Sequence, residues 1–205
     1  MSIQPAKFQT LDESGQAWQL QRVLLFSGHM IDAPHRNPPR FPPEKAELAA
    51  QCIANSLDDL QVGPTDLALT QGANGGDILF AEACLQRGVK LQLLQPFEEA
   101  EFIANSVTPA NSDWLQRYQA ITQQLSAPPL AAPSELGALP PDMNSYERCN
   151  LWLLASGLAY DPEKLVLICL WDGGGGDGPG GTAHMVEQVQ KQHGQVIWLD
   201  TRTLW

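Results

Sequence analysis

The sequence contains no uninterrupted apolar run long enough to cross a membrane, which takes about 18 to 20 residues. Its first residues, MSIQPAKFQTLDESGQAWQLQR, also lack a basic start followed by an apolar stretch, so they do not resemble a secretory signal. We therefore expect a cytoplasmic protein that does not contact a membrane. With 205 residues, 43% of them hydrophobic and 17% charged, the chain is long enough for one substantial core.

Basic residues are scarce: the chain has 12 Lys and Arg against 23 Asp and Glu, and its formal net charge is −11. Nucleic acids are bound mainly through Lys and Arg on their phosphates, so this balance excludes a nucleic-acid polymer as the expected partner. It does not exclude a small anion, because backbone N–H groups and helix N-termini bind phosphate without a positively charged surface.

Cysteine and histidine are also few, with four of each, and neither has the spacing of a metal site. Cys52, Cys84, Cys149 and Cys169 lie far apart among apolar neighbours, with no CxxC pair. We expect buried free thiols, not disulfides or zinc ligands. We predict no protein-encoded metal site and no required cofactor, although a bound nucleotide could bring Mg²⁺ with it.

What the sequence does contain is an alternation of short apolar strands with helices. Apolar runs predict strands over 23–28, 66–70, 90–96, 164–171 and 195–200, and periodicity predicts helices over 43–60, 78–88, 97–107, 111–125, 144–160 and 182–193. This alternation is typical of an α/β fold: a Rossmann-like three-layer sandwich whose mostly parallel central sheet carries helices on both faces. We expect one domain over 22–205, an irregular N-terminal arm over 1–21, and a Pro-rich surface loop over 126–142.

Glycines concentrate directly after three of the predicted strands. They follow the first strand (Gly28), the second (Gly72, Gly75 and Gly76) and the fourth, where GGGG at 173–176 precedes DGPGG at 177–181. Right-handed crossovers place the C-terminal ends of parallel strands on one edge of the sheet. All three turns are therefore expected on the edge where such folds bind their ligands.

The turn after the first strand, SGHMIDAPHR, offers groups suited to a phosphate or a ribose. Ser27 and Gly28 can supply a hydroxyl and an amide, and Arg36 and Arg40 in the following loop can add positive charge. A tight turn with solvated arginines explains the same residues equally well. His29 could act as an acid or a base beside a ligand, although a hydrogen-bonded turn histidine is the commoner role.

The turn after the second strand, TQGANGGDILFAEA, is rich in glycine and opens a helix. Free N–H groups at a helix start point at whatever lies above them. Asp77 could cap that helix or accept a hydrogen bond from a ribose hydroxyl. The stretch matches neither GxGxxG nor the Walker sequence, so neither fingerprint applies. We include Gly72, Gly75, Gly76 and Asp77 among the candidate ligand-binding residues.

The turn after the fourth strand, LWDGGGGDGPGGTAHMVE, divides into two halves. The four-glycine run indicates a flexible extension, whereas Gly180, Gly181 and Thr182 precede a helix and can bind a phosphate. Asp172, at the strand end, stands where a ribose-binding or catalytic carboxylate would. Glu187 lies within the new helix, where it could be a solvated residue or a catalytic carboxylate.

Three of these stretches resemble one protein family. PGGTAHMVE is similar to the PGGxGTxxE signature of the LOG-type (Lonely Guy) phosphoribohydrolases and of the wider SLOG group of nucleotide-binding Rossmann-like domains, which includes the DprA-like fold. YERCNLW resembles the family's ERK-containing segment, and TQGANGGDILFAEA resembles its glycine turn after the second strand. The resemblance spans 23–200, with the motifs in the expected order.

The resemblance implies a nucleotide whose phosphate lies over the PGG loop, and a homodimer, since proteins of this family are commonly dimers. In the enzymes, an arginine and a glutamate from these motifs help cleave the N-glycosidic bond of a nucleoside monophosphate; by motif position these would be Arg148 and Glu187. Ala183 and His184, however, stand where the family has Gly and Thr, and Cys149 replaces its lysine. These departures favour binding over catalysis.

Three functions are therefore expected, in decreasing order. The first is binding of a nucleotide or a nucleotide-derived phosphate at the glycine-rich edge of the sheet. The second is LOG-like hydrolysis of a nucleoside monophosphate to base and ribose phosphate. The third is a protein-interaction module whose ligand site has decayed and whose Pro-rich segment 126–142 docks a partner.

Overall fold

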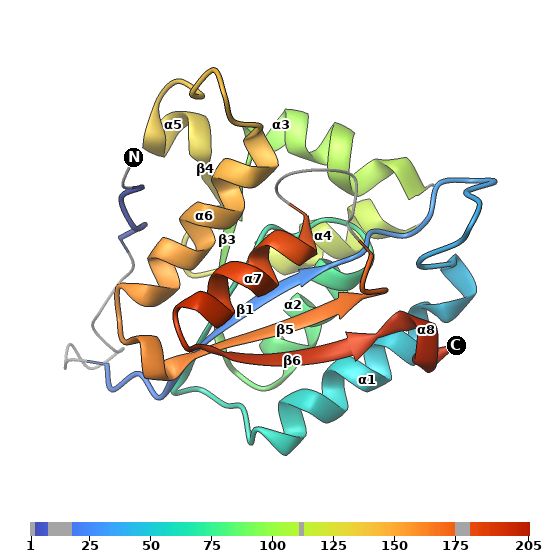
Figure 1. The fold of residues 1–205 in the computed structure, drawn as a ribbon, viewed down its shortest axis with the longest axis horizontal. Helices are drawn as coiled ribbons and strands as arrows, with labels where there is room; N and C mark the ends of the chain where they lie inside the picture. Colours follow the sequence, from blue (N-terminus) through green and yellow to red (C-terminus); the bar gives the residue numbers. More distant parts are fainter. Residues whose placement is uncertain (1–2, 8–17, 111–112, 175–180) are drawn as a thin grey trace.

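A computed structural model describes residues 3–7, 18–110, 113–174 and 181–205 of the chain. At its centre is one six-stranded sheet in which every pair of neighbouring strands is parallel (Figure 1). In chain order the strands are β1 (Arg22–Gly28), β2 (Asp66–Thr70), β3 (Lys90–Gln95), β4 (Leu130–Ala131), β5 (Leu165–Trp171) and β6 (Gln195–Asp200). Their order across the sheet is β4–β3–β2–β1–β5–β6.

Helices cover both faces of the sheet and complete three layers (Figure 1). On one face lie α1 (Ala46–Asp59), α2 (Gly76–Gln86) and α4 (Trp114–Thr122). On the other lie α5 (Ala132–Leu136), α6 (Ser145–Leu158) and α7 (Thr182–Lys191). The short helices α3 (Glu99–Phe102) and α8 (Thr201–Leu204) complete the set of described α-helices. The predicted α/β sandwich is confirmed, and its sheet is parallel throughout.

The strands divide their side chains between two cores. In β1, Leu24 and Phe26 pack toward α1 and α2, whereas Val23 and Leu25 pack toward α6 and α7. A strand buried on both faces needs a continuous apolar run, which is why the sequence shows runs and not an alternating pattern. The two edge strands are exceptions: β4 is only partly buried, and the residues of β6 are exposed or only partly buried.

The predicted strands agree with the structure to within one residue at each end. Two predicted helix boundaries are also confirmed. Gly88 closes α2 with a positive φ of 69°, and Asn144 caps α6 by accepting a hydrogen bond from the N–H of Glu147 at 2.8 Å. None of the described helices is long and apolar enough to pass through a lipid bilayer.

The expectation of a plain surface loop over 126–142 is wrong in part, because this segment holds β4 and α5. Leu130 and Ala131 pair with the end of β3, and the fully buried Ala132 starts a helix with Pro133 in its first turn. A two-residue strand is too short to show a period, and proline is tolerated at the start of a helix. The composition of this segment therefore gave no indication of β4 or α5.

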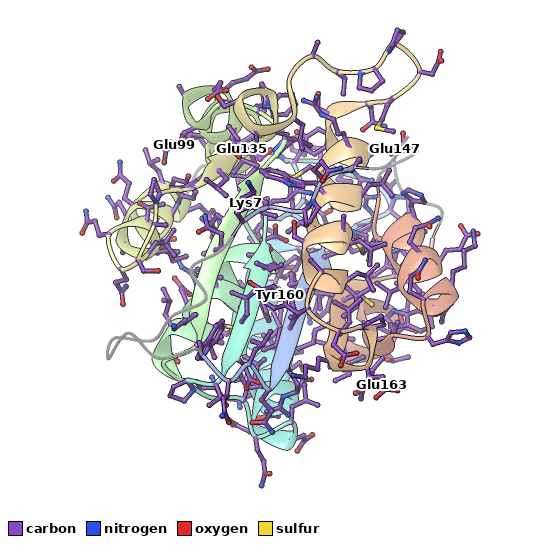
Figure 2. The ribbon with its side chains drawn as sticks, turned by 90° about the vertical axis from the view of Figure 1, so that its left-hand side faces the viewer. Lys7, Glu99, Glu135, Glu147, Tyr160 and Glu163 are labelled. Atoms are coloured by element: carbon purple, nitrogen blue, oxygen red, sulfur yellow. The ribbon has the colours of Figure 1, made fainter. Side chains whose placement is uncertain are left out.

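The N-terminal arm is irregular in its described parts, 3–7 and 18–21, but it lies against the domain. Ile3, Ala6 and Trp18 pack on the core that α6 covers. The N–H of Ala6 donates to Oγ of Ser156 in α6 at 2.9 Å (Figure 2, where the adjacent Lys7 is labelled). These contacts fix the ends of the arm to the α6 face.

The strand order reverses between β1 and β5. From β1 the chain adds β2, β3 and β4 on one side and then returns through α6 to place β5 and β6 on the other. Open parallel sheets bind ligands in the crevice beyond the carboxyl ends of the strands at such a reversal. The register pairs Gly28 with Leu170, so the turns after β1 and β5 leave the sheet side by side at this point.

Candidate functional site

Four polar side chains, which we call the switch-point cluster, stand where the strand order reverses: Ser27 and His29 at the end of β1, Asp172 just after β5, and Thr182 at the start of α7. Four of the predicted ligand-binding residues from the first and third glycine turns are thus brought together. Gly28 lies between the first two, and a Cβ there would lie 2.8 Å from Cε1 of Phe26. Glycine therefore lets β1 end against the core without displacing that ring.

The hydroxyl groups of Ser27 and Thr182 join the end of β1 to the start of α7. Their oxygens lie 3.1 Å apart, and Thr182 is only 8% exposed. The N-cap of α7 is Gly181, whose backbone is extended. Glycine has no side chain with which to cap the helix, and the N–H of His184 donates to the carbonyl of Gly181 at 3.1 Å.

His29 and Asp172 form the second pair of the cluster. The backbone N–H of His29 donates to the carbonyl of Leu170 at 3.0 Å, which fixes the turn beside β5. Nε2 of His29 accepts the N–H of Asp172 at 3.2 Å and lies 3.3 Å from Oδ1 of the same residue. That Oδ1 also accepts the N–H of Gly174 at 2.9 Å. Asp172 therefore orients both the imidazole and the first residues of the glycine-rich segment.

Burial lowers the pKa of His29 below its ordinary value of 6.5, against the opposing effect of the Asp172 carboxylate. Burial raises the pKa of Asp172, but the N–H of Gly174 and the His29 ring outweigh burial, so the net pKa is lowered. Near neutral pH the pair is thus a neutral imidazole beside an ionised carboxylate. A neutral Nε2 can accept the Asp172 N–H, as the observed distance requires.

Of the two arginines in the loop after β1, Arg40 has the closer electrostatic relation to the cluster. Its positive charge lowers the pKa of both His29 and Asp172. Arg36, the other predicted source of positive charge for a ligand, instead lies 3.5 Å from a carboxylate oxygen of Asp32. Asp32 also accepts the backbone N–H groups of Arg40 and Phe41, each at 2.8 Å, and so shapes the loop. Sequence spacing gave no means to rank the two arginines.

The glycine turn after β2 closes on its own chain. The N–H of Gly72 donates to Oδ2 of Asp77 at 3.1 Å, and the N–H of Gly76 donates to the carbonyl of His29 at 3.1 Å. A Cβ on Gly75, where φ is +81°, would lie 2.8 Å from the backbone nitrogen of Ile31. The glycines thus let this turn approach the β1 loop closely, and the amides of Gly72, Ala73, Asn74 and Gly76 all have acceptors within the protein.

Asn74, a residue not singled out from the sequence, holds this turn to two other segments. It is 1% exposed. Its Oδ1 accepts the N–H of Ile31 at 3.0 Å, and its Nδ2 donates to the carbonyls of Ser106 and Val107 at 3.1 and 3.3 Å. The sequence signal that could have identified Asn74 is an asparagine between glycines in a turn. Its hydrogen-bond partners, however, lie in segments distant in sequence.

Asp77 is buried at the first turn of α2, next to this closed loop. Burial raises its pKa to about 6, and the backbone N–H groups of Ala73 and Gly72 partly offset that effect. The predicted cap role is wrong, because the N-cap of α2 is Gly75 and the described residues give that helix no side-chain cap. Asp77 instead accepts hydrogen bonds from the N–H groups of Gly72 and Ala73 in the preceding turn.

The two predicted catalytic residues occupy contrasting environments. Arg148, in the first turn of α6, is 4% exposed; one of its Nη atoms donates to the carbonyl of Gly137 at 2.8 Å, and its Nε has no hydrogen-bond partner within the described part of the chain. The Glu187 side chain is 61% exposed on α7 and forms an ion pair with Lys191 at 2.7 Å. Lys191 lowers the pKa of Glu187 through this contact.

The predicted phosphate-binding Gly180 and the second half of the four-glycine run lie outside the described residues, which resume at Gly181. Gly173 and Gly174 are described at the start of the segment. Gly173 has a φ of +77°, and a Cβ there would lie 3.1 Å from Cζ2 of Trp198. Glycine at 173 therefore allows close packing against β6.

The β3 and β4 side of the same edge is acidic. Glu99 follows β3, Glu135 lies in α5 and Glu147 lies in the first turn of α6, and Figure 2 shows all three toward one end of the molecule, with Glu163 toward the other. Like charges repel an anion, so an anionic ligand is favoured over β1 and β5, near Arg40, and not over β3 and β4.

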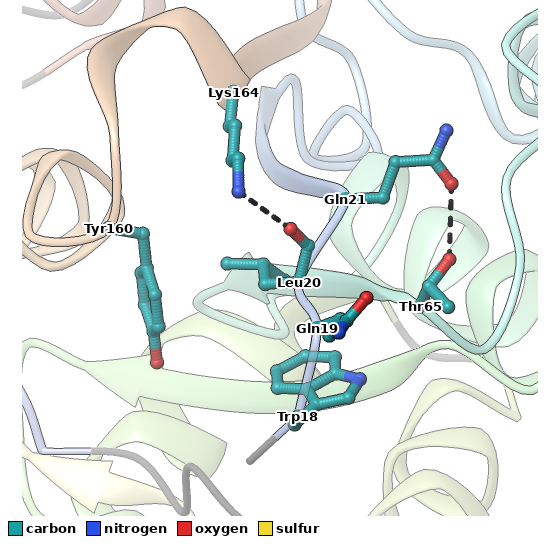
Figure 3. Close-up of a pocket in the computed structure, with 7 residues that line it drawn as sticks. All are labelled: Trp18, Gln19, Leu20, Gln21, Thr65, Tyr160 and Lys164. Carbon is teal, nitrogen blue, oxygen red and sulfur yellow. Dashed lines mark hydrogen bonds between the residues drawn. The ribbon is translucent and has the colours of Figure 1, made fainter.

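A cavity of about 670 Å³ lies at the opposite edge of the sheet (Figure 3). Its lining comprises Trp18, Gln19, Leu20, Gln21, Thr65, Tyr160 and Lys164, none of which is a predicted site residue. Nζ of Lys164 donates to the carbonyl of Leu20 at 2.9 Å, and the Thr65 hydroxyl donates to Oε1 of Gln21 at 3.1 Å. These polar groups hold the arm to the sheet.

The described residues contain no group of three or more His, Cys, Asp or Glu side chains arranged to hold a metal ion. In comparisons with known proteins, no family model matches the chain, and no curated protein is significantly similar to it. A relation to the SLOG group therefore rests on the sequence resemblance alone.

Proposed function

We propose that this protein binds a nucleotide or a nucleotide-derived phosphate at the switch-point cluster. The observation that carries the proposal is the pair of hydroxyl groups, Ser27 and Thr182, placed 3.1 Å apart at the reversal of strand order and at the start of α7. Hydroxyl donors, an uncapped helix N-terminus and a switch-point crevice are the three features that parallel α/β folds use to hold phosphate.

The charge of the site supports the same ligand class. The chain is acidic as a whole, but Arg40 places a positive charge near His29 and Asp172. The ionised Asp172 carboxylate stands beside the phosphate position and is a natural acceptor for a ribose hydroxyl. At the switch-point cluster, an anion would therefore meet hydroxyl donors and the charge of Arg40. A sugar attached to that anion would meet the Asp172 carboxylate as an acceptor.

Binding is better supported than N-glycosidic hydrolysis. Hydrolysis by the family route would use Arg148 and Glu187, and the exposed Glu187 carboxylate is paired with Lys191 on its own helix. A carboxylate that stabilises an oxocarbenium-like sugar must instead face the scissile bond in a site that excludes water. The hydrolase therefore remains the second candidate.

The test is a thermal-shift screen of the full chain against nucleoside mono-, di- and triphosphates, ADP-ribose, cyclic nucleotides and ribose 5-phosphate. A ligand at 100 times its dissociation constant adds about 2.7 kcal/mol of stability, which a melting curve resolves. For the best ligand, Thr182→Val and Ser27→Ala should each weaken binding about tenfold, since each removes a hydrogen bond to a charged group.

Thr122→Val is the matched control, because the Thr122 hydroxyl bonds only to a carbonyl one turn back in α4 among the contacts described. It should leave the affinity unchanged. If no ligand in the panel raises the melting temperature, or if Thr182→Val binds as tightly as the natural chain, the proposal is wrong.

A further inference from the structure

Two tryptophans, the exposed Trp198 and the half-buried Trp171, form an aromatic surface beside the switch-point cluster. Trp171 ends β5 and Trp198 lies in β6, with ring centroids 5.4 Å apart and ring planes inclined by 36°. Trp198 is 46% exposed, the highest value among the exposed large hydrophobic side chains of the described chain. Leaving so large an apolar ring in water is unfavourable, so this surface suits a flat, apolar ligand group.

The positions of both rings are fixed by the turn that carries Asp172. Nε1 of Trp171 donates to the carbonyl of Gly174 at 2.9 Å, and Nε1 of Trp198 donates to the carbonyl of Trp171 at 2.9 Å. Gly173 packs directly against Trp198. A preformed aromatic surface binds a ring without first having to order its own side chains.

The sheet register places this surface in line with the proposed phosphate position. Ser27 pairs with Cys169, and Cys169 pairs with Trp198, so the three residues form one row across β1, β5 and β6. Residues of such a row share a face of the sheet, here the face of α6 and α7. Two strand spacings, about 9.5 Å, separate Ser27 from Trp198. A phosphate at one end of this row and a base at the other would be joined by the sugar.

We propose that the Trp171–Trp198 pair is the subsite for the aromatic base of the nucleotide whose phosphate is held at the switch-point cluster. This inference rests on the proposed function and adds that the ligand must carry a base, not only a sugar phosphate. Stacking accepts any base because every base has a π-face. Arg202, with its guanidinium 5.4 Å from the Trp198 ring centroid and paired with Asp200, borders the same surface.

A second aromatic pair at this edge is less suited to the role. Phe97 and Tyr146 meet edge to face, with centroids 5.3 Å apart, and the Tyr146 hydroxyl lies 3.2 Å from Oγ of Ser106. Glu99 and Glu147 lie on this side of the edge, where they disfavour an attached phosphate. Tyr146 therefore offers a control position with a similar exposure, 38%.

The test compares AMP, GMP, CMP and UMP with ribose 5-phosphate by titration calorimetry on the full chain. The natural chain should bind at least one nucleoside monophosphate about 10- to 100-fold more tightly than ribose 5-phosphate, the gain that base stacking supplies. Trp198→Ala should abolish most of this preference while leaving the affinity for ribose 5-phosphate unchanged. Trp198→Phe should retain part of it, and Tyr146→Ala should retain all of it.

The outcomes separate this inference from the proposed function. Tight nucleotide binding that Trp198→Ala and Trp198→Phe leave intact would overturn the base subsite alone, as would a preference lost in Tyr146→Ala. Equal affinity of the natural chain for nucleotides and ribose 5-phosphate would also overturn it without any variant, so the test does not depend on the folding of Trp198→Ala. Absence of binding by all five compounds would overturn the subsite, and the proposed function is overturned as well only if the rest of the nucleotide panel also fails to bind.

Discussion

The turn after β2 and the turns that meet beyond β1 and β5 stand on the same edge of one sheet, yet they use their glycines differently. After β2, the backbone of Gly75 and Gly76 lies against the β1 loop, and the Gly76 amide donates to the carbonyl of His29. At the start of α7, Gly181 leaves a helix end uncapped beside the Ser27–Thr182 hydroxyl pair. We call the first the closed turn and the second, where Gly181 provides no side-chain cap, the open site.

The difference shows what a glycine cluster at a strand end signals. Glycine permits close approach of another group to the backbone, and that group can be the protein's own chain as readily as a phosphate. The hydrogen-bond partners of the amides separate the two cases. Substitutions in the closed turn should therefore change stability, while those in the open site should change ligand binding.

The largest effect is expected at Gly75 in the closed turn. Gly75→Ala introduces a Cβ 2.8 Å from the Ile31 nitrogen, at a residue whose φ is +81°. Left-handed strain and overpacking together should lower the free energy of unfolding by about 4 kcal/mol, as measured by urea denaturation. The control Gly63→Ala meets no atom within 4 Å, and should change that free energy by less than about 0.5 kcal/mol. Equal effects at the two positions would contradict a closed turn.

The next effect is a pH dependence at Asp77. Its folded-state pKa is raised from 3.8 to about 6, so the folded protein binds a proton that the unfolded chain releases between these values. The resulting stabilisation is full below about pH 4 and is lost as the pH rises through 6. Relative to Asp77→Asn, the natural chain should lose about 3 kcal/mol between pH 4 and pH 7. A stability difference that stays constant over that range in urea denaturation would refute a buried, raised Asp77.

A smaller pH dependence of stability, opposite in sign to that of Asp77, is expected at His29 in the open site. It is smaller because the Asp172 carboxylate raises the pKa of His29 and so offsets part of the lowering by burial. Because the folded-state pKa lies below 6.5, the unfolded chain takes up the proton first as the pH falls. Stability contributed by the neutral ring is thus present above 6.5 and is lost below it. The melting temperature of the natural chain should fall relative to His29→Gln as the pH is lowered from 8 to 5. A difference that rises instead would mean that the ring is held charged.

The smallest effect is expected at Glu187, the exposed residue of α7. Glu187→Gln should change neither the melting temperature nor the affinity for the best nucleotide, because the side chain is solvated and paired only with Lys191 among the contacts described. Incubation of the natural chain with that nucleotide should release no free base by chromatography. Base release that disappears in Glu187→Gln while binding survives would establish the hydrolase instead.

The fold could be predicted from the sequence because its strands are buried on both faces. Val23 to Phe26 and Leu165 to Leu170 are continuous apolar runs, and each is followed by a glycine-containing turn. Burial on two faces leaves this pattern in any single sequence. The strand and the α-helices that escaped prediction, β4, α5 and α8, have two, five and four residues, too few for a period to be visible.

The site could be predicted only in part, because its contacts join distant segments. Ser27, His29, Asp172 and Thr182 could be proposed individually from their places at strand and helix ends. Three contacts depend on how the loops pack in space. Ser27 meets Thr182, and Asn74 binds the β1 loop. Arg40 acts on the pKa of His29 more than Arg36 does. No local pattern encodes these pairings.

The parallel pairing of β1 with β5 also constrains the order in which the molecule can be built. The Ser27–Thr182 contact spans 155 positions, and both flanks of the crevice exist only once β5 and α7 have been synthesised. Until then, the edge of β1 that pairs with β5 has no partner strand, although the edge that pairs with β2 can already be covered. On a ribosome adding about 5 to 20 residues per second, the crevice is therefore assembled seconds after the first strand emerges, when only β6 remains to be added to the sheet.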